Sequence, residues 1–130
     1  MIQTVTFLVT KYYAFFFILA FIGDRFQNSV LSNSHGYSEL LQYTLSYFIS
    51  ISWAVLLLVL VLGLPFYFVL RVRNGSILLL CLTILLLVEY GLYTWGASPS
   101  DLWNGVYNAI ITVVFLFLFF KPVLVNAVNR

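Results

Sequence analysis

Charged residues are scarce in this chain of 130 residues, since six basic and four acidic side chains make up only 8% of the sequence. A soluble domain carries about 25% charged residues, so this chain lacks the polar surface that a water-soluble globule needs. The mean hydropathy is +1.06, and we therefore expect lipid to surround most of the chain. A net charge of +2, thinly spread, also argues against nucleic-acid binding, which needs a clustered basic face.

Cysteine and histidine are almost absent as well. Cys81 is the only cysteine, which excludes an internal disulfide or a thiolate cluster, and we expect it to pack as a small apolar side chain. His35 is the only histidine and lies in a polar segment, so no metal site is expected. We find no nucleophile with a base beside it, no glycine-rich phosphate loop and no pair of haem ligands. Enzymes are therefore the least supported class, and no cofactor is expected.

Long apolar runs are what the sequence does contain. A membrane-spanning helix needs roughly 20 mostly apolar residues at ~1.5 Å each, and four runs meet that requirement, over residues 4–23, 43–70, 76–95 and 102–120. The predicted fold is an all-α bundle of four transmembrane helices that forms one membrane domain over residues 1–130. Residues 24–42 are expected to form an outer loop, with a possible short helix over residues 37–42. We expect Lys121 and Pro122 to end the last span.

The second run is longer than a bilayer requires, so it should tilt, bend near Pro65 or extend along the membrane surface. The short connections after it predict that the second, third and fourth spans pack as antiparallel neighbours. Basic residues favour the cytoplasmic side. Five of the six fall on one side if both termini are cytoplasmic: Lys11, Arg71, Arg73, Lys121 and Arg130. We expect a bacterial inner-membrane protein in this orientation.

Glu89 is the feature that needs an explanation, because it lies well inside the third apolar run. A charge at such a depth is costly and usually has a role. Residues four apart share a helix face, and three spans carry polar rows toward their outer ends. These rows are Gln42, Ser46 and Ser50 in the second span, Glu89 and Tyr93 in the third, and Asn104, Asn108 and Thr112 in the fourth. We expect the rows to meet in a polar outer half of the bundle.

Two interpretations of Glu89 stay open at this point. In the first, which we favour, the rows join helices, and Asn108 or Tyr93 hydrogen-bonds Glu89. In the second, they line a water-filled vestibule or a groove for a partner, where Glu89 is an exchangeable charge. Lys11 lies near the middle of the first run. We expect its stem to lie along the helix while its ammonium reaches the headgroups, and an internal pair with Glu89 is the less favoured alternative.

Three functions are compatible with these features. The favoured hypothesis is a non-catalytic accessory subunit that binds another membrane protein through the polar outer half of the bundle. The second is a small oligomeric transporter or channel in which Glu89 couples protons or substrate. The third is an immunity or exclusion protein that acts through the loop over residues 26–41. The expected partners are membrane lipids together with another membrane protein or further copies of the chain.

Overall fold

The computed structural model describes residues 1–97 and 102–129, and these residues are almost entirely helical. The helices are α1 (Ile2–Phe21), α2 (Tyr37–Val69), α3 (Gly75–Leu92) and α4 (Trp103–Val128). Two π-helical segments, η1 (Gln27–Leu31) and η2 (Tyr93–Ala97), follow α1 and α3. Four helices are long and apolar enough to cross a membrane, which confirms the predicted all-helical chain of four spans and indicates a membrane protein.

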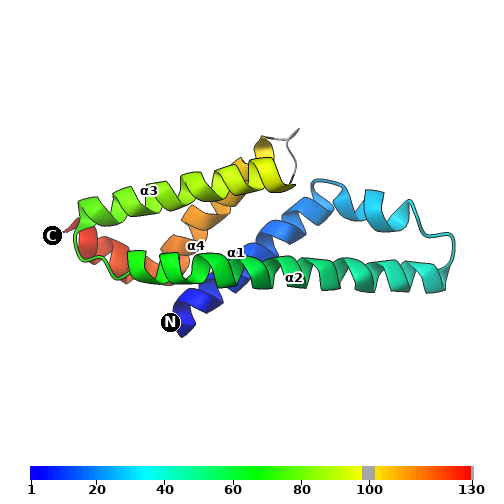
Figure 1. The fold of residues 1–130 in the computed structure, drawn as a ribbon, viewed down its shortest axis with the longest axis horizontal. Helices are drawn as coiled ribbons and strands as arrows, with labels where there is room; N and C mark the ends of the chain where they lie inside the picture. The colour runs from blue at the N-terminus through cyan, green and yellow to red at the C-terminus, as the bar shows by residue number, and fades with distance from the viewer. Residues whose placement is uncertain (98–101, 130) are drawn as a thin grey trace.

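The first helix lies at the centre of the bundle. α1 packs against α2 on one side and against α4 on the other, and α4 packs against α3. Figure 1 shows α1 crossing the long axis of α2 obliquely. In its most apolar window α1 has 44% of its residues buried, compared with 11% for α2 and for α3. The expectation that the second, third and fourth spans are neighbours holds for α3, which packs on α4 and, less extensively, on α2. It does not hold for α2 and α4, because each of these two helices packs mainly on α1 or α3.

The buried side chains of α1 recur every three or four residues, as expected for a helix face directed at a core. They are Thr4, Phe7, Leu8, Lys11, Tyr12, Phe15 and Leu19. Phe7 contacts the rings of Phe66 and Phe120 with centroid distances of 5.8 and 5.6 Å. This aromatic cluster joins α1 to α2 and α4 at the end of the bundle that carries Arg71, which we call the Arg71 end. The opposite end, which carries Trp95 and Trp103, is called the Trp103 end.

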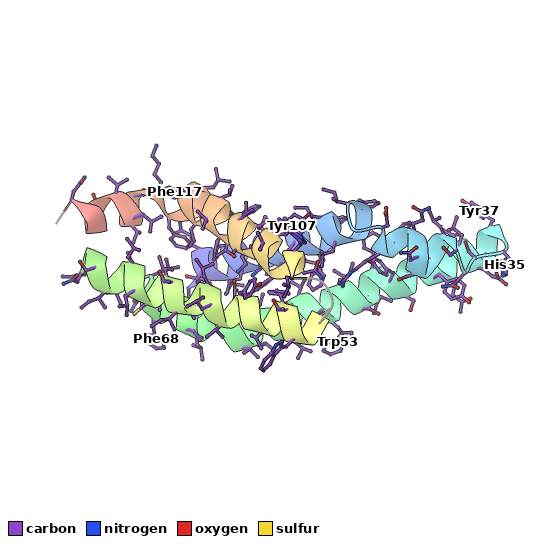
Figure 2. The ribbon with its side chains drawn as sticks, turned by 90° about the horizontal axis from the view of Figure 1, so that it is seen from above. His35, Tyr37, Trp53, Phe68, Tyr107 and Phe117 are labelled. Atoms are coloured by element: carbon purple, nitrogen blue, oxygen red, sulfur yellow. The ribbon has the colours of Figure 1, made fainter. Side chains whose placement is uncertain are left out.

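The second helix is much longer than the others. Its 33 residues span about 50 Å at ~1.5 Å per residue, so α2 extends beyond the Trp103 end of the bundle, where η1 packs beside it. Figure 2 shows His35 and Tyr37 at the tip of this extension. Residues 37–42, expected mainly as loop, form the first turns of α2. Glu39 accepts a hydrogen bond of 3.0 Å from the backbone N–H of His35 at that helix start.

The fourth helix continues past the residues that were expected to end it. α4 runs to Val128 with Pro122 inside it, and Phe120 has non-helical dihedral angles of φ −126° and ψ 20°. Proline removes one backbone donor and clashes with the preceding turn, so the chain bends near Phe120 and then resumes its helix. The side chain of Gln3 donates a hydrogen bond of 2.7 Å to the carbonyl of Phe119 beside this bend. The expected turn between the third and fourth spans falls partly on residues 98–101, which lie outside the described residues.

Candidate functional site

A buried ion pair lies at the centre of the bundle. Lys11 on α1 and Glu89 on α3 both have 0% exposure. The Lys11 Nζ atom donates to Glu89 Oε1 at 2.6 Å and to Oε2 at 2.7 Å. The two residues are 78 positions apart in the sequence. Because α1 and α3 each pack against α4, this pair adds a direct link between two helices that share α4 as a neighbour.

Two further side chains donate to the same carboxylate, and a third lies close to it. The Tyr12 hydroxyl donates to Glu89 Oε1 at 2.5 Å. Asn108 Nδ2 donates to Oε2 at 3.0 Å, and Thr112 Oγ1 lies 3.4 Å from the same oxygen. Thr112 also donates to the backbone carbonyl of Asn108 at 2.7 Å. With donors from α1 and α4, both oxygens of Glu89 are hydrogen-bonded, which is what a carboxylate away from water requires.

The expected position of Lys11 is wrong. Instead of reaching the headgroups, its ammonium is enclosed by the rings of Tyr12, Phe66 and Phe7 at centroid distances of 4.5, 5.1 and 5.9 Å. The structure instead has the less favoured alternative, an internal pair of Lys11 with Glu89. Pairing and ring contacts replace the hydration that the ammonium would otherwise seek.

The polar row of the fourth span faces inward as expected. Asn104, Asn108 and Thr112 are 3%, 1% and 0% exposed, respectively, and the last two bind Glu89. Tyr93 is also buried, but its ring packs on Phe15 at a centroid distance of 4.5 Å. No hydrogen bond joins Tyr93 to Glu89 among the described residues. Tyr12 makes that contact instead, and the only signal for it in the sequence is its position next to Lys11.

The polar row of the second span does not join the others. Gln42, Ser46 and Ser50 are exposed, and Ser50 donates to the carbonyl of Ser46 within its own helix at 2.9 Å. The expectation that three polar rows meet is therefore wrong for α2. A different serine, Ser52, faces the bundle edge and accepts a hydrogen bond of 3.0 Å from the Tyr13 hydroxyl. Periodicity identified the row correctly but could not show which way it faces.

Helices α3 and α4 approach closely at the Trp103 end because α4 has a glycine there. A Cβ atom at Gly105 would lie 2.3 Å from Tyr90 Cδ2 and 3.0 Å from Thr94 Oγ1. Small residues allow helix backbones to approach in this way. This contact holds α3 against α4 a little more than one turn from Glu89, and so helps to fix Asn108 against the carboxylate.

Two hollows flank the ion pair. At the Trp103 end, a pocket of about 210 Å³ lies between the end of α1 and the start of α4, and its lining includes Leu19, Gly23, Trp103, Asn104 and Tyr107. Toward the Arg71 end, a groove of about 430 Å³ lies between α3 and α4. Its lining is almost wholly apolar and includes Leu82, Leu86, Val113, Leu116 and Leu124. Polar and apolar hollows thus lie on opposite sides of Glu89 along the bundle.

The described residues contain no group of three or more His, Cys, Asp or Glu side chains placed to hold a metal ion. Cys81 is half-buried on α3, and His35 is exposed at the tip of the α2 extension. No known protein-family model matches the chain, and comparison with curated proteins and with solved structures found no match either.

Proposed function

We propose that this chain is a non-catalytic membrane subunit that binds a helix of another membrane protein along the exposed face of α2. The observation that carries the proposal is a depression of about 400 Å³ on this one helix, lined by Leu45, Phe48, Ile49, Ser52, Trp53 and Leu56. Their spacings of three and four residues match the seam through which one helix packs on another. Trp53 is 62% exposed, and Figure 2 shows it projecting from the outside of α2.

The small residues beside this depression support the same proposal. Ser46, Ser50 and Ala54 recur every four residues, and both serines are exposed. In lipid, small residues at this spacing let a second helix approach closely, and this packing is a main source of association between spans. A row of small side chains with bulky ones beside it is a surface on which a second helix can pack.

The closed ion pair also supports a structural role for Glu89. Three side chains, Lys11, Tyr12 and Asn108, already donate to its carboxylate, so a charged solute would have to displace one of them. A pair that joins α1, α3 and α4 keeps the bundle rigid while α2 presents its outer face. The distribution of basic residues fits an orientation in which both termini are cytoplasmic and the α2 extension lies outside.

Site-specific photocrosslinking tests this proposal. A photoreactive phenylalanine analogue at Trp53, introduced into the full chain in its native membrane, should form an adduct with one defined membrane protein, identified by mass spectrometry. The matched control is Leu87, which is 65% exposed on α3 and should yield no such adduct. The adduct should also disappear in the Ser50→Phe variant, because a large side chain blocks close approach. A dimer of the chain, or equal adducts from Leu87, would overturn the proposal.

A second candidate function is a small oligomeric transporter in which Glu89 exchanges a proton or binds substrate. The observation that favours it is the position of a paired charge inside a membrane-spanning bundle, which is uncommon without a role in transport. In the transporter, Glu89→Gln should abolish solute movement in liposomes or remove its pH dependence while the assembly stays intact. Dissociation of the complex by this substitution, with no solute moved by the unmodified protein, would exclude transport.

A further inference from the structure

Four buried polar atoms near the Trp103 end have no hydrogen-bond partner among the described residues. They are Tyr93 Oη, Thr94 Oγ1, Asn104 Nδ2 and Asn108 Oδ1. Tyr93, Thr94 and Asn104 are 5%, 7% and 3% exposed, and Asn108 is 1% exposed. A buried polar group without a partner destabilises the folded state, and four in one part of a small bundle need a common explanation.

Three of these atoms belong to residues in the part of the bundle between the pocket and the ion pair. Asn104 lines the pocket of about 210 Å³ at the Trp103 end. Asn108 lies one turn deeper on α4, about 6 Å along the helix, and its amide nitrogen already donates to Glu89 at 3.0 Å. Thr94 Oγ1 lies beside Gly105, where a Cβ atom would be 3.0 Å from it. The unpartnered groups thus connect an open pocket with the buried carboxylate.

The chemistry of these atoms identifies the ligand class. The amide nitrogen of Asn104 can only donate, the amide oxygen of Asn108 can only accept, and the hydroxyl of Thr94 can do both. An anion would satisfy only donors and a cation only acceptors, whereas water does both. Because a water molecule takes about 30 Å³ of liquid volume, the pocket of about 210 Å³ has room for several.

The opposite side of the ion pair is closed by aromatic rings. Phe7 lies one turn from Lys11 toward the Arg71 end, with 0% exposure, and Phe66 is also 0% exposed. Phe7 packs edge to face on Phe66, Phe119 and Phe120 at centroid distances of 5.8, 6.1 and 5.6 Å. This cluster offers water no hydrogen-bonding side chain, so hydration from the Arg71 end is unfavourable.

We propose that a short file of bound water enters from the pocket at Asn104, hydrogen-bonds Thr94 and Asn108, and ends at the Lys11–Glu89 pair. The pair is thereby in contact with the aqueous phase at the Trp103 end and is sealed from the other end. This inference is independent of the helix-binding face on α2, since it concerns the opposite side of α1.

Hydroxyl-radical footprinting of the unmodified chain in detergent micelles tests the proposal, because radicals formed from bound water oxidise the side chains beside it. The oxidation rate of each residue is divided by the oxidation rate of the same residue in the unfolded chain. Tyr12, although 0% exposed, should be oxidised at least severalfold faster on this scale than Phe7 and Phe66, which are equally buried. If Tyr12 is as strongly protected from oxidation as the two phenylalanines, the proposal is overturned.

A variant of the pocket adds a second measurement. Asn104→Leu removes the donor at the mouth and fills part of the pocket, so the oxidation of Tyr12 should fall severalfold. Asn126→Leu, an exposed site on the same helix, should leave it unchanged. An equal effect of the two variants, or none from Asn104→Leu, would contradict entry at this pocket. The unmodified chain still tests the water file if Asn104→Leu does not fold.

Discussion

Removing the Lys11 charge should destabilise the bundle strongly. In Lys11→Met, the carboxylate of Glu89 keeps only two neutral donors, Tyr12 and Asn108, at a site with 0% exposure. Removing one partner of a buried pair costs about 3–5 kcal/mol. We expect that loss in the free energy of unfolding, measured from helix content during a titration with sodium dodecyl sulfate in mixed micelles.

The charge-free double variant separates pairing from packing. Lys11→Met combined with Glu89→Gln leaves no buried charge, so it should be at least as stable as either single variant, which gives a coupling energy of several kcal/mol. The matched control is Lys121→Met, because Lys121 is exposed and should change stability by less than about 0.5 kcal/mol. Additive effects of the two single substitutions, or a loss below about 1 kcal/mol for Lys11→Met, would refute the buried pair.

Three other substitutions are expected to change the same free energy of unfolding. Gly105→Ala should cost about 1–3 kcal/mol because its Cβ atom meets the Tyr90 ring, whereas Gly91→Ala, with nothing within 4 Å, should be neutral or slightly stabilising; equal losses would contradict the close approach of α3 and α4. Asn108→Leu should lower the free energy of unfolding more than Thr112→Val, since the Asn108 contact to Glu89 is 3.0 Å and the Thr112 contact 3.4 Å. A larger loss from Thr112→Val would contradict this difference in contacts. Asn74→Ala should cost about 1 kcal/mol by removing the cap of α3, and no change would show that the cap adds nothing.

Much of the helical framework was predictable because it depends on local sequence. Four apolar runs of sufficient length can be recognised without any tertiary information, and their expected bounds agree with the structure to within a few residues except at the start of α2 and the end of α4. At the end of α4, the sequence predicts that Pro122 ends the helix. Instead, α4 bends at Phe120 and continues through Pro122, because a kink relieves the clash of the proline ring and leaves only one backbone hydrogen bond unmade.

The candidate site was only partly predictable, for a geometric reason. Helical spacing shows which residues share a face, as for Asn104, Asn108 and Thr112, but it does not show which neighbour that face meets. The row containing Ser46 and Ser50 has the same spacing, yet it faces away from the bundle. The pairing of Lys11 depends on how α1 packs against its neighbours, which no local pattern encodes.

The α2 extension has a practical consequence. A protein of 14.9 kDa that is mostly enclosed by detergent offers few features for aligning particle images in electron microscopy. The hairpin formed by η1 and the first turns of α2 projects past every other helix (Figure 1), with Tyr37 78% exposed near its tip. An antibody fragment raised against this hairpin would bind the protein outside the micelle without contacting the Lys11–Glu89 pair.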